Sequence, residues 1–324
     1  MSVSEQRRKR NFAVAALAAA GLAITTSGAI SASTPVPVRA SSLNEVAPAA
    51  SGDWFAWSRS RGNGNSPFDV FAQQPGQAAF KVNPKGTQAF TGGIDGTTLV
   101  YQLIRGRRGT RSDLRLYDLA TRRQLPMPTG VNSPKWECCG TTSGGWIFYG
   151  RGQTRSRDPQ LILLRNLTTG EQRVLDTLRD ARGVTRAGQL NGNFAVWQRC
   201  DPRPKCEIFR YDLTTAASTA LPRTPGKIVH SPSVNDSGTV YYVQGNRGCG
   251  KSVQVVRQPV DGAAQVVLSL PPGRDIVVTY ADRVTPRPPG RVRTTRVYYD
   301  LLRCKPRTWD IYRVDDTESI PPPP

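Results

Sequence analysis

The sequence is poor in the groups from which common active sites are built. It contains a single histidine, His230, and its cysteines and carboxylates do not show the spacing of metal ligands. No Gly-x-Ser-x-Gly motif is present to expose a nucleophilic serine on a sharp turn. We therefore expect no metal, no cofactor and no catalytic role for His230, and we expect that the protein is not an enzyme.

Long apolar runs are also missing, apart from one near the N-terminus. Four basic residues, Arg7–Arg10, precede the uncharged segment 12–30, which is the pattern of a signal peptide. We assign residues 1–32 to this signal peptide and keep an uncleaved membrane anchor as the alternative. Small residues offer cleavage sites at Ser27 and Ala29 or at Val38 and Ala40. The mature chain is therefore expected to be secreted or otherwise extracytoplasmic.

Helical periodicity is scarce, whereas one strand-like pattern returns six times. A small or polar residue is followed by two or three apolar residues and usually by an aromatic one. The copies begin at Gly52, Gly96, Gly144, Gly192, Gly238 and Arg296. The five glycines lie 44, 48, 48 and 46 residues apart, which is a spacing typical of propellers and solenoids.

Each copy is accompanied by a shorter apolar run before it and two alternating runs after it. The second strands are expected at 53–59, 97–104, 146–150, 194–199, 239–244 and 296–302. This pattern predicts an all-β fold, a six-bladed β-propeller of four-stranded antiparallel blades over residues 44–315. The last copy lacks a fourth strand, which the N-terminal segment 33–43 could supply. Residues 316–324 are expected to form a Pro-rich tail.

The third strands and the turns after them carry a resemblance. An Asp-Ile/Leu-x-aromatic strand followed by Asp/Asn-Leu-x-Thr/Gly is similar to the repeat of TolB-like six-bladed propellers. It occurs at Asp113–Thr121, Ile162–Gly170, Ile208–Thr214 and Asp310–Asp315, with part of a Ser-Pro-Asp-Gly signature at Ser231-Pro232 and Asn235–Gly238. The N-terminal α/β domain of TolB itself is not recognisable here. The resemblance implies a fold and a tendency to bind partners.

Positive charge is concentrated in the loops between the second and third strands. These loops hold Arg59, Arg61, Arg105, Arg107, Arg108, Arg111, Arg151, Arg155, Arg157, Arg199, Arg203, Lys205, Arg247, Lys251, Arg303, Lys305 and Arg307. Only Asp158 and Asp201 oppose them, so the loops account for +15 of the +16 charge of residues 41–324. By repeat symmetry all six loops emerge on one face.

Two interpretations of this basic face remain open. An abundance of arginine in solvated loops can reflect genome composition alone. The functional interpretation is a binding module for an anionic partner, such as a cell-envelope polymer, a lipid headgroup with peripheral membrane contact, or an acidic polysaccharide. Nucleic acid is not favoured, because the loops hold almost no aromatic residues for stacking. We expect a monomer.

Two other functions are kept as alternatives, a scaffold for another exported protein and a propeller-type carbohydrate-active enzyme. The enzyme would need a pair of carboxylates lining the channel. Acidic residues recur at equivalent strand starts, namely Asp69, Asp113, Glu207 and Asp310. Because catalysis needs one site and not a copy in most blades, we expect these residues to have a structural role.

The six cysteines fit an oxidising compartment, in which an even count is typical of disulfides. Cys200 and Cys206 face each other across one predicted hairpin. Cys249 and Cys304 lie in equivalent loops of neighbouring blades. We predict both of these disulfides. The adjacent Cys138 and Cys139 are either a strained vicinal disulfide or two thiols. Alternation along a strand favours thiols unless the chain kinks at Gly140.

Overall fold

The computed structural model describes residues 34–62, 67–105, 111–152, 159–180, 182–201, 205–222, 224–245, 249–282, 292–305 and 307–319. The chain divides into two compact units, Met1–Ser31 and Ala32–Pro324, and every described residue belongs to the second unit. The predicted signal peptide lies outside the described residues. In the described part of the chain, no helix has the length and apolar character that crossing a membrane requires.

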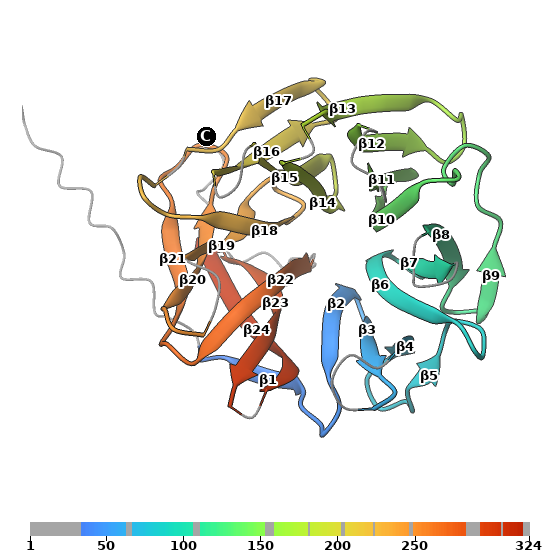
Figure 1. Ribbon diagram of the computed structural model, residues 1–324, viewed down its shortest axis with the longest axis horizontal. Coiled ribbons are helices and arrows are strands. Elements are labelled where there is room, and N and C mark those ends of the chain that lie inside the picture. Colours follow the sequence, from blue (N-terminus) through green and yellow to red (C-terminus); the bar gives the residue numbers. More distant parts are fainter. Residues whose placement is uncertain are drawn as a thin grey trace, which may run out of the picture. The chain divides into compact units, whose positions relative to one another are not determined.

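The second unit is an all-β propeller in which antiparallel sheets surround a central axis (Figure 1). Four of its sheets have four strands each. From the innermost strand outward, one sheet contains β2 (Glu45–Ser51), β3 (Trp54–Ser60), β4 (Phe68–Gln73) and β5 (Phe80–Lys81). A second contains β14 (Val184–Asn191), β15 (Phe194–Cys200), β16 (Cys206–Asp212) and β17 (Ala217–Ala220). A third contains β18 (Val229–Val234), β19 (Val240–Gly245), β20 (Val253–Gln258) and β21 (Gln265–Leu270). The fourth contains β22 (Arg274–Asp282), β23 (Val292–Cys304), β24 (Arg307–Ser319) and β1 (Val36–Arg39).

The remaining strands form one eight-stranded sheet, where the sequence predicted two separate blades. Its strands are β6 (Gln88–Asp95), β7 (Thr98–Arg105), β8 (Arg111–Asp118), β9 (Arg123–Leu125), β10 (Trp136–Ser143), β11 (Trp146–Gly152), β12 (Gln160–Asn166) and β13 (Gln172–Leu178). The first four and the last four are each joined by antiparallel pairing. One parallel pair, Trp136 with Ser112, links the two halves. The structure therefore has five sheets among the described residues where six blades were predicted, and this single pair accounts for the difference.

The N-terminal segment supplies the outer strand of the last sheet. β1 pairs antiparallel with β24, and Val36 stands opposite Arg313. The guanidinium of Arg39 lies 4.3 Å from the ring centre of Trp57 on β3, and it also donates a hydrogen bond to Gln73 on β4. The segment thus joins the last sheet to the first.

The predicted tail begins too early, because β24 continues to Ser319 opposite residues 292–296 of β23. The acidic segment can continue the strand because its buried carboxylate has partners. Asp316 accepts hydrogen bonds from Arg257 at 3.0 Å and from the Tyr241 hydroxyl at 2.8 Å. The propeller therefore extends at least four residues beyond the predicted boundary at 315, and 320–324 lie outside the described residues.

The glycines that mark the sequence repeat lie in the turns between first and second strands. Gly52, Gly96, Gly144 and Gly192 have φ angles between 56° and 58°, in the left-handed region that glycine adopts without steric cost. The amides of three of them donate to the preceding blade: Gly96 to Ser51 at 3.1 Å, Gly144 to Asp95 at 2.9 Å and Gly192 to Ser143 at 3.0 Å. The repeat thus encodes both a turn and a contact between blades.

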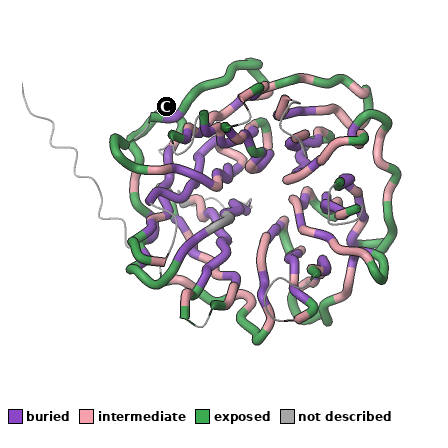
Figure 2. The backbone as a smooth tube through the Cα atoms, viewed as in Figure 1, coloured by how far each residue is buried: buried purple, intermediate pink, exposed green. Residues whose placement is uncertain are grey.

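The core lies between neighbouring sheets and is built mainly from the second strands (Figure 2). Every residue of β19 is buried, and five consecutive residues of β7 are buried. On the second strands, Trp57 and Trp197 are buried. Trp54 and Trp146 are only half-buried, because their positions begin a strand at a turn, and Arg173 covers the ring of Trp146 at 4.9 Å.

Candidate functional site: the loop face and the central cavity

Two features of the described residues are candidates for function, the basic loops and a cavity in the central channel. The loops between second and third strands emerge at the end of the ring where the first strands begin, as the pairing of Arg274 on β22 with Arg303 on β23 shows. We call this end the loop face. Of the predicted anion-binding residues, Arg107, Arg108, Arg155, Arg157, Arg203 and Arg247 lie outside the described residues.

Six of the predicted anion-binding cations are held by carboxylates. The pairs are Arg61 with Asp69 (2.6 Å), Arg105 and Arg111 with Asp113 (2.8 and 4.0 Å), Arg151 with Glu137 (2.9 Å), Arg199 with Asp176 and Asp201 (3.0 and 3.1 Å), and Arg303 with Asp310 (3.1 Å). Apart from Asp201, these carboxylates belong to strands and were not counted in the predicted loop charge. They neutralise part of the +15.

Three of the four recurring acidic residues at strand starts, Asp69, Asp113 and Asp310, take part in these contacts. Burial disfavours the charge of Asp69, but hydrogen bonds from Arg61, Asn83 and Lys81 outweigh it and lower the pKa of Asp69 well below its usual range. Burial raises the pKa of Asp310, which Arg303 offsets only in part. Glu207 stands opposite Arg199 in the strand register. Asp69, Asp113 and Asp310 therefore hold arginines of the loop face.

Other cations of the loop face are free of carboxylates. In the part of the chain that the structure describes, Lys205, Lys251, Lys305 and Arg307 are exposed and make no ion pair. Arg59 is also unpaired, and its guanidinium lies 3.9 Å from the ring centre of Phe71. These five residues are the described part of the predicted site that remains available to a partner.

Both predicted disulfides are present, and they brace the loops that carry the free lysines. Cys200–Cys206 closes the loop between β15 and β16, with Cα atoms 3.9 Å apart. Cys249–Cys304 joins two neighbouring blades, with Cα atoms 5.8 Å apart. Lys205, Lys251 and Lys305 are each adjacent to or two residues from one of these cysteines.

Backbone hydrogen bonds add to the brace between the two blades. The amide of Gly273 donates to the carbonyl of Cys249 at 2.7 Å, and the amide of Cys304 donates to the carbonyl of Gly273 at 3.1 Å. This brings the exposed Arg274 next to the same loops, and Arg274 too has no ion pair among the described residues. We call Lys251, Arg274, Lys305 and Arg307 the braced cluster. Arg274 was not among the predicted residues, because it begins a first strand and does not lie in a loop between second and third strands.

The central cavity arises from a β-bulge that recurs in every innermost strand. The pairing register shifts after Val46, Thr91, Cys138, Ala187, His230 and Ile276. At three of these bulges the residue after the shift has a positive φ: Ala47 (54°), Cys139 (58°) and Ser231 (54°). A bulge bends its strand and re-aims its side chains. The bulges enclose a cavity of about 230 Å³.

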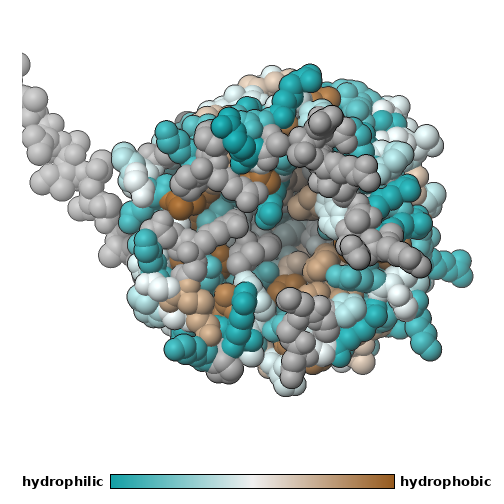
Figure 3. Space-filling model, viewed as in Figure 1, coloured by the Kyte–Doolittle hydropathy of each residue, from teal (hydrophilic) through white to brown (hydrophobic). Residues whose placement is uncertain are grey.

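The cavity lining is mostly apolar and contains no carboxylate among the described residues. Its walls include Pro48, Phe90, Pro232 and Tyr280. Figure 3 shows a hollow in the middle of the ring with hydrophobic surface beside it, whereas hydrophilic side chains dominate the rim. Arg186 is the cation that lines the cavity. Arg186 could not be predicted from the sequence, because nothing in the repeat marks a residue that faces the axis.

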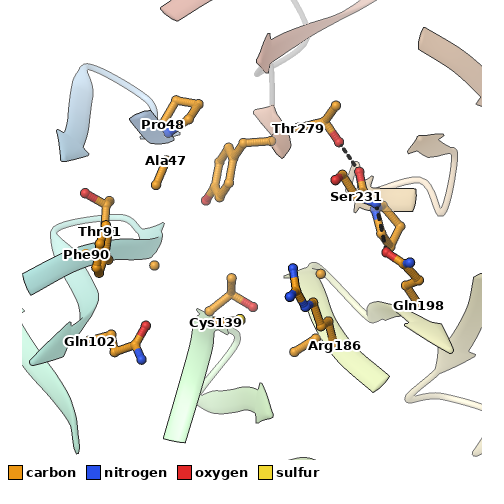
Figure 4. Close-up of a pocket in the computed structure, with 16 residues that line it drawn as sticks. Ala47, Pro48, Phe90, Thr91, Gln102, Cys139, Arg186, Gln198, Ser231 and Thr279 are labelled. Atoms are coloured by element: carbon orange, nitrogen blue, oxygen red, sulfur yellow. Dashed lines mark hydrogen bonds between the residues drawn. The ribbon is translucent and has the colours of Figure 1, made fainter. Parts of the chain in front are cut away.

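Cys139 also lines the cavity, and Figure 4 shows it on the strand next to that of Arg186. Cys138 and Cys139 are two thiols whose Sγ atoms lie 2.8 Å apart. Thiols were predicted unless the chain kinked at Gly140, and the residue with left-handed backbone is instead Cys139, with a φ of 58°. The hydrogen bond with Cys138 and the charge of Arg186 lower the pKa of the Cys139 thiol.

His230 lies within β18 and is 1% exposed. Its Nδ1 is 3.0 Å from the hydroxyl of Ser231. Among the described residues, no group of three or more histidine, cysteine or acidic side chains is arranged to hold a metal ion.

Comparison with known proteins supports the fold and does not extend to a closer relationship. No family model and no curated protein sequence matches the chain. A structure assigned to TolB from Agrobacterium tumefaciens is 12% identical, with a TM-score of 0.52 over 87% of this chain and 92% of that one. An acylaminoacyl peptidase from Pyrococcus horikoshii is 12% identical, with a TM-score of 0.50 over 86% of this chain and 52% of that one.

TolB from Acinetobacter baumannii is 14% identical, with a TM-score of 0.47. The matched region covers 78% of this chain but only 61% of the Acinetobacter protein. At these identities the likeness concerns the fold alone. The chain therefore has a β-propeller fold that resembles TolB-like propellers.

Proposed function

We propose that the protein is an exported six-bladed propeller that binds an anionic partner through its loop face. Six blades result when the eight-stranded sheet is divided at the Ser112–Trp136 pair, as the antiparallel pairing of each half supports. Export is supported by the two disulfides, which persist in oxidising compartments.

The braced cluster is the observation that carries the proposal. Its four cations are exposed and unpaired among the described residues. Lys251 and Lys305 lie in loops, and Arg274 and Arg307 begin β22 and β24, at an end of the blades that a disulfide and backbone hydrogen bonds hold together. Cations on ordered loops lose less conformational freedom when they bind than cations on flexible ones. The partner we propose is an acidic polymer or lipid surface of the cell envelope, because multivalent contact is needed when each exposed charge pair contributes about 0.5 kcal/mol.

A binding role is favoured over the two alternatives. The carbohydrate-active enzyme would need acids in the channel, and the cavity lining includes none among the described residues. A protein scaffold would favour an exposed apolar patch. The exposed large apolar residues among those described are Val36, Val174, Val260 and Val266, which belong to three different blades.

The test compares two sets of charge-removing substitutions. The triple variant Lys251→Gln, Lys305→Gln, Arg307→Gln should bind polygalacturonate or phosphatidylglycerol vesicles about tenfold more weakly than the wild type at low salt. The matched control removes three charges at the opposite end of the ring, with Arg122→Gln, Arg123→Gln and Arg293→Gln, and should bind nearly as well as the wild type.

Binding of the wild type should weaken steeply with salt, because exposed charges are screened over about 10 Å at 0.1 M. Equal losses from both triple variants would mean that net charge and not this face is responsible. Absence of binding to polygalacturonate, to the vesicles and to single-stranded DNA at low salt would leave the loop face as solvated surface and refute the proposal.

A further inference from the structure

The central cavity contains a charge that no described residue of its lining balances. Arg186 is exposed to this space and makes no ion pair or hydrogen bond with any described residue. By contrast, Arg151 on β11 and Arg199 on β15 are each paired with carboxylates. In Figure 4 the guanidinium of Arg186 points from its strand toward the middle of the ring.

The other polar groups of the lining are mostly hydrogen-bonded within the protein. Gln198 accepts from the amide of Ser231 at 3.2 Å, and the Thr279 hydroxyl donates to the carbonyl of Ser231 at 2.5 Å. The Tyr280 hydroxyl donates to the carbonyl of Ile94 at 3.2 Å. These bonds tie the innermost strands together and leave Arg186 as the charged donor that a ligand could engage.

The remaining wall is apolar and large enough for a small ring. Ala47, Pro48, Phe90, Ala187 and Pro232 supply surfaces that cannot form hydrogen bonds through their side chains. A cavity of about 150 Å³ accommodates benzene, and this one has about 230 Å³. A ligand that fits both parts has one anionic group and a compact apolar body.

We propose that the cavity is a binding site for a small monocarboxylate with an apolar body, whose carboxylate pairs with the guanidinium of Arg186. Arginine holds a carboxylate through two parallel N–H···O bonds, which fixes the orientation of the ligand. The apolar body packs against Pro48, Phe90 and Pro232. This site is separate from the loop face and does not depend on the function proposed for it.

Calorimetric titration with benzoate tests the site, with benzamide as the uncharged isostere. The wild type should bind benzoate at least about tenfold more tightly than benzamide, since hydrogen bonds between charged groups are the stronger ones. Arg186→Gln should lose this preference, and Arg186→Lys should keep part of it. Lys251→Gln, on the braced cluster, should bind benzoate as the wild type does.

A second measurement uses only the wild type, so it does not depend on the folding of a variant. Cys139 lines the same cavity, so bound benzoate should slow its alkylation by iodoacetamide, and benzamide at equal concentration should slow it less. Mapping of the modified peptide identifies the residue. Equal affinity for benzoate and benzamide, equal binding by the wild type and Arg186→Gln, or absence of binding by benzoate, isobutyrate and acetate would each overturn the proposal.

Discussion

Asp300 on β23 shows how one buried residue influences the whole fold. Its carboxylate is 2% exposed and accepts hydrogen bonds from the amide of Ala47, at 3.0 and 3.1 Å. Burial raises the pKa of Asp300 to about 8, because the single amide offsets only part of the lost hydration. An aspartate in an unfolded chain has a pKa of about 3.9. At pH values between about 3.9 and about 8, Asp300 is therefore protonated in the folded state and ionised in the unfolded state.

The free energy of unfolding should therefore fall as the pH rises from about 4 to about 8, and it should level off above that. Asp300→Asn keeps an acceptor for the Ala47 amide and cannot ionise. The melting temperature of this variant should change less between pH 5 and pH 8 than that of the wild type. The difference between the two proteins should correspond to about 1 kcal/mol of unfolding free energy per pH unit. Thermal unfolding followed by circular dichroism measures this.

Asp118→Asn is the control for this substitution. Asp118 is a half-buried carboxylate whose pKa is lowered by a hydrogen bond from the hydroxyl of Thr121. Its removal should not flatten the pH dependence of stability. A wild-type melting temperature that rises from pH 5 to pH 8 and a variant that follows it would contradict the prediction for Asp300.

At the scale of elements, the two disulfides constrain loops of very different length. Cys200 and Cys206 are 6 residues apart within one hairpin, and Cys249 and Cys304 are 55 residues apart across two blades. Closing a longer loop removes more conformational entropy from the unfolded chain. The interblade disulfide should therefore contribute more to stability than the hairpin disulfide.

The double variant Cys249→Ser, Cys304→Ser should lose about 4 kcal/mol of unfolding free energy, and Cys200→Ser, Cys206→Ser about 2 kcal/mol. Denaturant unfolding without reductant measures both, and each variant serves as the control for the other. If the hairpin variant proved the less stable of the two, the chain-entropy explanation would be wrong for this protein.

At the scale of the whole propeller, the ring is closed by strands from both ends of the described chain. β1 covers the edge of β24, and Arg39 reaches the first blade. A strand edge left uncovered offers unpaired backbone groups to another chain. The contact between β1 and β24 therefore protects the molecule from edge-to-edge association as well as joining its ends.

Removal of residues 34–40 from the mature protein should lower the melting temperature and produce oligomers in size-exclusion chromatography. Removal of residues 320–324 should leave both properties unchanged, because every described contact remains. A monomeric truncated protein that melts at the wild-type temperature would show that β1 is dispensable for closure.

Much of this fold could be predicted from the sequence because the responsible interactions are local. The glycines at φ near 57° and the alternating runs after them specify turns and strands within one blade. The pairing of Cys200 with Cys206 follows from a single hairpin. Prediction was weaker where two blades meet, as at the Ser112–Trp136 pair that merges two predicted sheets.

The candidate sites were less predictable than the fold. The basic loops could be found from composition, but the partner of each arginine could not. Arg105 is paired with a strand carboxylate, whereas Lys305 is free, and both occur in loops of similar composition. Arg186 stands on a strand whose polar positions look like any solvent-facing ones, so only the ring shows that it faces the cavity.

The sequence by itself determined the repeat, the strand positions, the two disulfide pairs and the excess of positive charge, because each depends on residue type and short-range spacing. The tertiary structure decided which charges are neutralised, where the sheets merge and what the channel contains. These outcomes depend on distances between blades far apart in the chain. The bulges that shape the cavity come from six different strands, and only their assembly around one axis creates the cavity.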